Sequence, residues 1–183
     1  FCDFVFLFGR VQRTKVQEQI IAELDALYNL GWRDRVFFVD DNFIGNKEKL
    51  KKEILPVLIK WMKEKGQPFS FSTEASVNLS DDEELMDLMV EAGFSEVFLG
   101  IETPEENSLT ECGKLQNKNR DLISCVKKIQ RKGIEVQGGF IVGFDHDKPS
   151  IFERQIKFIQ KSGIITAMVG ILEVLRDTKL YHR

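Results

Sequence analysis

Cysteine is scarce in this sequence, and the few cysteines present are far apart. The 183 residues contain only Cys2, Cys112 and Cys125. An odd, widely spaced set argues against a disulfide framework and for a reducing compartment, so we expect a cytoplasmic location. No C-x2-C pair occurs either, which leaves no complete local metal knuckle within these residues.

Excess basic charge and long apolar runs are also absent. Lysine and arginine number 26 against 29 acidic residues, for a net charge of −3. This balance lacks the general basic footprint of a nucleic-acid-binding protein. No apolar run approaches the roughly 18–20 residues of a membrane span, and residues 1–8 are too short and lack the basic start of a signal peptide. We expect neither a nucleic-acid partner nor a membrane span.

What is present is the composition of an ordinary globular domain, 43% hydrophobic and 30% charged. A chain of this length can bury a core, and we predict one domain over residues 1–183. The polar tail, residues 174–183, is expected to be partly disordered. Because the chain begins with Phe1 and with what reads as the end of a strand, we interpret it as a piece of a longer protein.

Apolar runs alternate with amphipathic segments along the chain. Strands are predicted at residues 36–40, 69–74, 97–102, 136–144 and 164–172. Helices are predicted within residues 14–31, 46–66, 80–93, 117–133 and 149–163, each stopped by a glycine, and Pro56 should kink or split the second helix. This alternation is typical of βαβ units in a parallel sheet, either a barrel or an open sheet. No GxGxxG follows the first strand, which disfavours a dinucleotide-binding domain.

Acidic side chains stand where the predicted strands end. They are Asp40 with Asp41, Glu74, Glu102, and Asp145 with His146. In a parallel barrel these positions share one rim, and converging acids require something positive among them. That partner could be a metal ion, a ligand ammonium, or lysine and arginine side chains. For any single residue, a helix N-cap or a solvated rim charge is an equally good reading.

Three glycines, Gly138, Gly139 and Gly143, lie in or beside the predicted strand 136–144. Glycine inside a strand often marks the close approach of a ligand or of another backbone. A bulge or tight barrel packing explains the same pattern equally well.

Five segments together resemble the radical S-adenosylmethionine superfamily. In chain order they are Phe1-Cys2-Asp3, residues 7–11 (Leu-Phe-Gly-Arg-Val), residues 39–43 (Val-Asp-Asp-Asn-Phe), residues 100–103 (Gly-Ile-Glu-Thr) and residues 138–145 (Gly-Gly-Phe-Ile-Val-Gly-Phe-Asp). The sequence is most similar to the cobalamin (B12)-binding class, in particular to the group that includes hopanoid methylases. The resemblance covers essentially the whole chain.

The resemblance implies a partial (β/α)6 TIM-like barrel, with helices outside a parallel sheet and most of the first strand missing. The family binds a [4Fe–4S] cluster through three cysteines spaced C-x3-C-x2-C. Cys2 is similar to the last of these, so the chain is expected to be truncated before the first two.

The resemblance also assigns roles to the strand-end residues. Asp40, Asp41 and Asn42 match the segment that receives the methionine amino group of S-adenosylmethionine. Glu74 and Glu102 match positions near the ribose hydroxyls or the methionine end. Gly139, Ile141 and Gly143 match the motif beside adenine.

The implied activity is reductive cleavage of S-adenosylmethionine to start radical chemistry, followed by cobalamin-dependent methyl transfer to an unactivated carbon. The substrate would be a small or lipid-like molecule, and an electron donor such as flavodoxin or ferredoxin would be needed. Two other readings stay open on the residues alone. One is a Mg²⁺-dependent barrel enzyme that uses the strand-end carboxylates, and the other is a non-catalytic truncated barrel.

Overall fold

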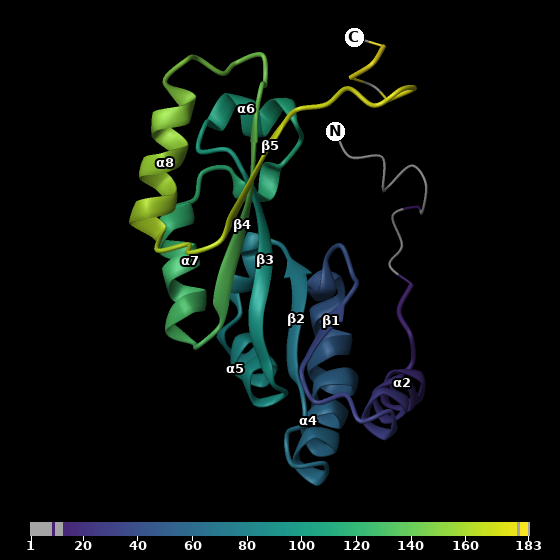
Figure 1. The fold of residues 1–183 in the computed structure, drawn as a ribbon. Coiled ribbons are helices and arrows are strands. Elements are labelled where there is room, and N and C mark those ends of the chain that lie inside the picture. Colours follow the sequence, from purple (N-terminus) through teal and green to yellow (C-terminus); the bar gives the residue numbers. More distant parts are fainter. Residues whose placement is uncertain (1–8, 10–12, 179, 183) are drawn as a thin grey trace.

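Five parallel strands form a single sheet in sequence order. The structure is a computed structural model that describes residue 9, residues 13–178 and residues 180–182. The strands are β1 (Arg35–Phe38), β2 (Ser70–Ala75), β3 (Phe94–Glu102), β4 (Glu135–Val142) and β5 (Ala167–Ile171), with β1 and β5 at the two edges (Figure 1). The predicted parallel α/β fold is confirmed, and the curled sheet corresponds to a partial barrel. The expected first-strand end and Cys2 lie outside the described residues.

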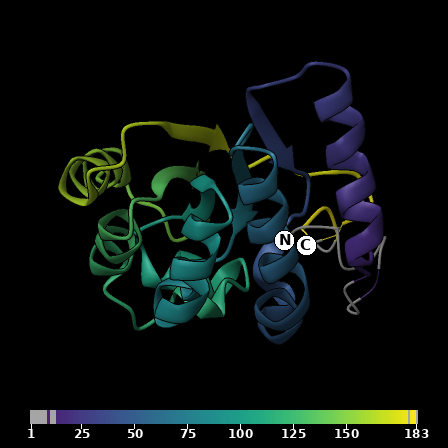
Figure 2. The ribbon, with the colours of Figure 1, turned by 90° about the horizontal axis from the view of Figure 1, so that it is seen from below.

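Five helices pack along one side of the sheet. They are α2 (Gln17–Asn29), α4 (Leu55–Glu64), α5 (Glu83–Glu91), α7 (Leu122–Arg131) and α8 (Ile151–Ser162). Viewed from below, they form an arc from α8 round to α2 (Figure 2). Each is followed by a glycine with positive φ, at positions 31, 66, 93, 133 and 163. The predicted glycine stops are therefore confirmed.

Short helical segments occupy the connections between strands and helices. They are η1 (Phe43–Asn46), α3 (Lys47–Lys49), η2 (Leu50–Ile54), η3 (Val77–Asp81), α6 (Glu106–Glu111) and η4 (Leu115–Asn117). The π-helical turn η2 directly precedes α4, which has Pro56 in its first turn. Proline has no N–H to donate and its ring crowds the preceding turn, so the helix widens there. The helix predicted to kink or split at Pro56 thus widens before it, while the helical backbone continues from Lys47 to Glu64.

The sheet has two different faces because side chains alternate along each strand. The outer face, under the helices, carries residues that are fully buried, such as Phe71, Val97, Leu99 and Val136. We call the opposite side, which carries Glu74, Phe98 and Gly139, the inner face. The register aligns Glu74 with Phe98 and Gly100 with Gly139. The inner face therefore presents Glu74 and Phe98 side by side, next to a pair of adjacent glycines.

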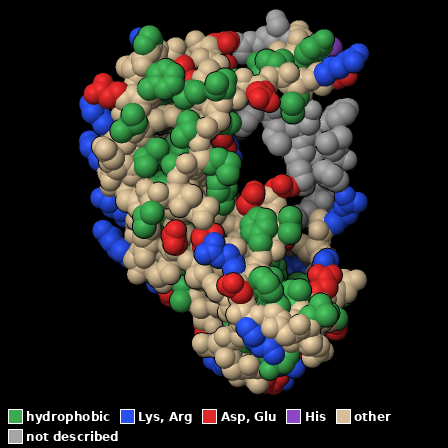
Figure 3. Space-filling view, in the orientation of Figure 1, with side chains coloured by type: hydrophobic (Ala, Val, Ile, Leu, Met, Phe, Trp, Pro, Cys, Tyr) green, Lys and Arg blue, Asp and Glu red, His purple; other side chains and the backbone are tan. Residues whose placement is uncertain are grey.

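Apolar side chains are exposed at both edges of the sheet. Met168 and Ile171 on β5 are 68% and 78% exposed, and Val39 after β1 is 84% exposed. In Figure 3, hydrophobic side chains gather over the part of the molecule that contains β5. None of the helices in the described ranges combines the length and apolarity that crossing a bilayer requires.

Candidate functional site

A polar pocket of about 200 Å³ lies at the carboxyl ends of β2 and β3. Four of the predicted site residues line it: Asp41, Asn42, Glu74 and Glu102. The other lining residues are Ala75, Ser76, Phe98, Gly100, Lys114 and Gln116. This is the edge of a parallel sheet at which α/β folds place their ligands. The structure therefore brings together residues that are separated by some 60 positions in the sequence.

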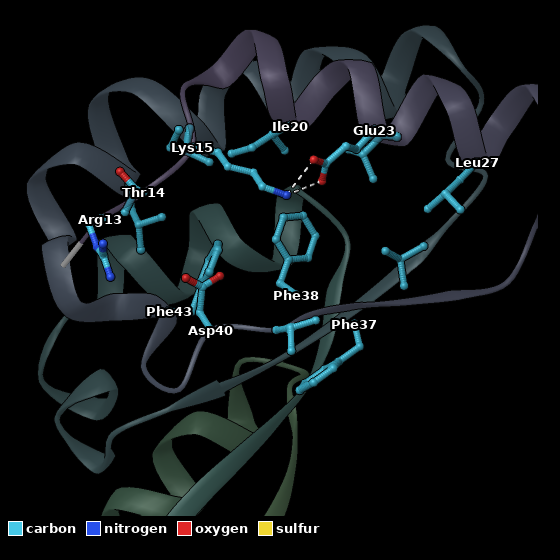
Figure 4. Close-up of a pocket in the computed structure, with 15 residues that line it drawn as sticks. Arg13, Thr14, Lys15, Ile20, Glu23, Leu27, Phe37, Phe38, Asp40 and Phe43 are labelled. Atoms are coloured by element: carbon cyan, nitrogen blue, oxygen red, sulfur yellow. Dashed lines mark hydrogen bonds and ion pairs between the residues drawn. The ribbon is translucent and has the colours of Figure 1, made fainter. Parts of the chain in front are cut away.

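Asp40 faces away from this pocket. It lines a larger cavity of about 390 Å³ between α2 and β1, whose walls are largely apolar (Figure 4). Lys15 and Glu23 both line this cavity, and their charged groups pair at 2.6 Å. Burial, together with the neighbouring charge of Asp41, raises the pKa of Asp40, and Lys15 opposes that rise. The two adjacent aspartates thus serve different cavities.

Asn42 fixes the loop after β1 to the loop after β2. Its Oδ1 accepts hydrogen bonds from the backbone N–H of Ser76 at 3.1 Å and from the Ser76 hydroxyl at 3.2 Å. The amide oxygen therefore shapes the pocket wall between Asp41 and Glu74.

Glu74 is half-buried at the end of β2, beside Asp41. Burial is the main cause that raises the pKa of Glu74, and the Asp41 charge adds to it, while Lys114 acts in the opposite direction. A hydrogen-bond donor or a cation that enters the pocket would therefore stabilise the charged form of this carboxylate.

Glu102 ends β3 in an unusual conformation. Its φ is +67°, in the left-handed region, and the register with β4 shifts between Gly100 and Glu102. Its Oε1 lies 2.7 Å from the Nζ of Lys114. A non-glycine residue in this region carries a backbone cost, and such residues concentrate at binding sites.

The two adjacent inner-face glycines make room for side chains. A β-carbon at position 139 would lie 2.8 Å from Cζ of Phe98, and one at position 100 would lie 2.6 Å from Oε1 of Glu102. The sequence left open whether Gly139 admits a ligand or allows tight packing, and in the structure the Phe98 ring lies in the space above it. Ile141 lies two residues further along the same face, level with Gly170 of β5.

The loop after β4 is held against α6. Gly143 has φ +107°, and its N–H and that of Phe144 both donate to Oδ2 of Asp147, at 2.8 and 3.1 Å. Oδ1 of Asp147 accepts from Ser108 on α6 at 3.0 Å. The backbone at Gly143 is thus fixed by Asp147, a residue to which the sequence pattern drew no attention.

His146, one of the predicted rim residues, is used in the same connection. Its Nδ1 lies 2.8 Å from Glu111 of α6. Among the residues that the structure describes, no group of three or more histidine, cysteine, aspartate or glutamate side chains is placed to hold a metal ion. The positive group beside Glu74 and Glu102 is Lys114, and Lys15 acts on Asp40.

Lys114, Phe98 and Gln116 line the pocket but were not predicted as site residues. Lys114 and Gln116 fall in the connection 103–116, whose composition predicts a loop with at most a helical turn, and the structure forms α6 there. The sequence indicated that a positive group should lie among the strand-end acids, but it did not indicate which lysine or arginine that would be.

Comparisons with known proteins identify the family. A model described as the radical SAM superfamily matches residues 1–159. An uncharacterized methyltransferase of Synechocystis sp. is 50% identical over the whole chain, and the hopanoid C-2 methylase of Rhodopseudomonas palustris is 40% identical. The chain covers 34% of each of these relatives, so it spans about a third of their length.

Solved structures agree with the fold. The radical S-adenosylmethionine methyltransferase TsrM of Kitasatospora setae superposes with a TM-score of 0.69 at 15% identity, over 89% of this chain and 31% of that one. Methylornithine synthase superposes with a TM-score of 0.61 at 14% identity, over 93% of this chain and 48% of that one. At these identities the likeness concerns the fold alone. With the family model matching most of the chain and two relatives at 40% identity or more, this chain belongs to the radical S-adenosylmethionine superfamily.

Proposed function

We propose that the full-length protein is a radical S-adenosylmethionine methyltransferase and that the polar pocket at the ends of β2 and β3 binds S-adenosylmethionine. The observation that carries this proposal is the convergence of Asp41, Glu74 and Glu102 in one pocket of a chain from this family. The named methyltransferases at 40% and 50% identity support the methyl-transfer step.

The side chains in the pocket suit the polar groups of this ligand. Its ammonium and ribose hydroxyls are hydrogen-bond donors, and carboxylates are the strongest side-chain acceptors for them. Asp41, next to the amide of Asn42, would receive the methionine ammonium. Glu74 and Glu102 would receive the ribose hydroxyls or the methionine end. Burial and like charge raise the pKa of Glu74, and a bound cation would oppose this rise by its attraction for the carboxylate.

The adenine would lie over β4. Gly139 and Ile141 sit on the inner face, and Gly143 exposes backbone just past the strand. The Phe98 ring above Gly139 offers an apolar surface between the acids and this region, and a flat ring is suited to pack against a base. Asp147 keeps the Gly143 backbone in place.

The cofactors would supply the redox and group-transfer chemistry. When bound, a [4Fe–4S] cluster supplies the electron that cleaves a C–S bond of S-adenosylmethionine, and cobalamin carries the methyl group. Cys2, the predicted iron ligand, lies outside the described residues. Cys112 and Cys125 lie at the end of α6 and on α7, and neither lines the pocket.

The finer details are part of the same proposal. The acceptor would be an unactivated carbon of a small or lipid-like molecule, reached with cobalamin and with an electron donor such as flavodoxin or ferredoxin. Hopanoid C-2 methylase, at 40% identity, supports a lipid-like acceptor. A cytoplasmic setting is also proposed, and the odd, widely spaced set of cysteines in the sequence supports it.

The test uses the full-length protein, reconstituted anaerobically with iron, sulfide and cobalamin. With a reductant and S-adenosylmethionine, it should release 5′-deoxyadenosine. The Asp41→Ala variant should bind S-adenosylmethionine about tenfold or more weakly and retain its iron content and visible cluster absorption. Glu53→Gln, at an exposed carboxylate in η2 outside the pocket, is the matched control and should behave as the unmodified protein.

Two outcomes would overturn the proposal. One is a cluster-loaded full-length protein that neither binds S-adenosylmethionine nor releases 5′-deoxyadenosine. The other is an Asp41→Ala variant that binds the ligand as tightly as the unmodified protein does.

A further inference from the structure

Helix α6 takes the place of β3 beside the carboxyl end of β4. Pairing between β3 and β4 ends at Glu102 and Phe140, whereas the last two residues of β4 still pair with β5. On the side that β3 has left, the loop after β4 contacts α6 instead (Figure 1). The position of Gly143, which exposes backbone in the proposed ligand site, therefore depends on α6 as well as on the sheet.

The segment that follows α6 is attached to the end of β3. The N–H of Lys114 donates to the Leu109 carbonyl at 2.9 Å, which closes the turn after the helix. Nδ2 of the fully buried Asn117 donates to the carbonyls of Gly100 and Ile101 at 2.9 and 3.1 Å. This end of α6 is thereby held to the strand end that lines the polar pocket.

Glu111 attaches α6 to the loop after β4. Its Oε1 accepts a hydrogen bond from the N–H of Asp145 at 3.2 Å, and its Oε2 lies 2.8 Å from Nδ1 of His146. The Glu111 side chain is only 8% exposed, although that of His146 is 54% exposed. Both oxygens of a nearly buried carboxylate thus contact the same loop.

Two further contacts join α6 to this region. Ser108 donates to Oδ1 of Asp147 at 3.0 Å, and Oδ2 of that aspartate accepts from the N–H of Gly143. Arg154 of α8 pairs with Glu105, the N-cap residue of α6. Glu111 holds residues 145–146, which lie between Gly143 and Asp147 in the loop.

We propose that Glu111 is a positioning residue for the nucleoside end of the ligand. By holding residues 145–146 against α6, it keeps the backbone at Gly143 in a fixed position relative to the carboxylates of the polar pocket. Because the loop is ordered beforehand, binding does not have to supply the free energy of ordering it. Glu111 is not among the described residues that line the polar pocket, so it acts through the loop and not by contact. This inference rests on the proposed function of the pocket.

The first measurement needs no ligand and uses the full-length, cluster-loaded protein. Glu111→Ala should speed amide hydrogen exchange of residues 143–147 about tenfold, because their hydrogen bonds open more often once the loop is released. Glu153→Ala, at an exposed carboxylate on α8 that pairs with Lys157, is the matched control and should leave this exchange unchanged. Unchanged exchange in Glu111→Ala would overturn the inference.

The second measurement separates the two ends of the ligand. 5′-Deoxyadenosine carries the nucleoside and methionine carries the amino acid, and each is measured as a competitor of S-adenosylhomocysteine under anaerobic conditions. Glu111→Ala should raise the inhibition constant of 5′-deoxyadenosine about tenfold and that of methionine less than about threefold. A residue that only stabilises the fold would change both constants equally or neither, and either result would overturn the inference.

A milder variant keeps the test decisive if Glu111→Ala folds poorly, as judged by melting temperature and iron content. Glu111→Asp keeps the charge but withdraws the carboxylate from the loop by one methylene, so it should show the same selective loss of 5′-deoxyadenosine. An equal loss of both competitors, or no loss of either, in the folded Asp variant would also overturn the inference. If the unmodified protein did not bind S-adenosylhomocysteine, the proposed function would fail, whereas hydrogen exchange would still test whether Glu111 holds the loop.

Discussion

The ring of Phe98 occupies the space directly above Gly139 on the neighbouring strand. A β-carbon at position 139 would lie 2.8 Å from Cζ and 3.0 Å from Cε1 of that ring. Phe98 also lines the polar pocket. Because Gly139 has no side chain, it leaves room for this ring, and it affects the pocket indirectly through the position of Phe98.

Gly139→Ala should displace the Phe98 ring and disturb the ligand site more than the fold. The clash is with the far end of a half-buried side chain, which can swing away at modest cost. We expect S-adenosylhomocysteine to bind about tenfold more weakly to the full-length variant, with only a small change in melting temperature.

Gly170→Ala is the matched control for this substitution, because a β-carbon there meets nothing within 4 Å. Adding Phe98→Leu to Gly139→Ala shortens the clashing side chain and should restore part of the affinity. Equal effects of the two glycine variants would contradict this role for Phe98.

Asn42→Ala should loosen the loop between β1 and η1. It removes the acceptor for two hydrogen bonds from Ser76 and leaves a half-buried N–H without that partner. We expect a loss of about 1–2 kcal/mol of unfolding free energy, measured by thermal or denaturant unfolding. Asn42→Asp keeps the acceptor oxygen and should retain most of that stability. An Ala variant as stable as the unmodified protein would contradict this role for the hydrogen bonds.

Glu74 should make stability depend on pH in a defined direction. Its pKa in the folded protein is raised above the ordinary value of 4.5, chiefly by burial and then by Asp41. The folded state therefore takes up this proton more readily than the unfolded state does. The stability that results is fully present at pH values below the ordinary pKa of a glutamate, and it is lost as pH rises through the raised pKa of Glu74.

Glu74→Gln removes that dependence. Without ligand, the variant should melt at a higher temperature than the unmodified protein near about pH 8, by the equivalent of up to about 1 kcal/mol, and the gap should close near about pH 4. The same substitution should weaken ligand binding. If the difference in melting temperature between the two proteins instead widened toward acid pH, the pKa of Glu74 would be lowered by folding and not raised, which would contradict the environment described above.

The sequence predicted the sheet well. It predicted less well which way the side chains just past each strand point. Strands of a parallel sheet that is covered by helices have continuous apolar runs, as at residues 36–38. The helices between them end at a glycine, as at Gly93, and both patterns are visible in the sequence. The strand at 36–40 ends at Phe38, however, so Asp40 and Asp41 lie in a turn and face different cavities. Adjacent residues past a strand end have no fixed alternation, so their directions depend on the loop.

Lys114 could not be placed from the sequence, because residues 103–116 are rich in Glu, Asn, Ser and Gly, which predicts a loop with at most a helical turn. Helix α6 is only six residues long, which is too short to be stable in isolation. Its contacts hold it in place, through the buried Leu109 and the hydrogen bond from Ser108 to Asp147. Such tertiary support brings Lys114 back over β3, twelve residues after Glu102, and local patterns of residues do not encode it.

A crystal structure of the full-length, cluster-loaded protein with S-adenosylhomocysteine would test the central claim most directly. The account predicts the ligand in the pocket at the ends of β2 and β3. Its amino group or ribose hydroxyls should lie within hydrogen-bonding distance of Asp41, Glu74 and Glu102, and its adenine should lie beside Gly139 and Ile141. Ligand density in the cavity between α2 and β1, with no ligand contact to these three carboxylates, would contradict it.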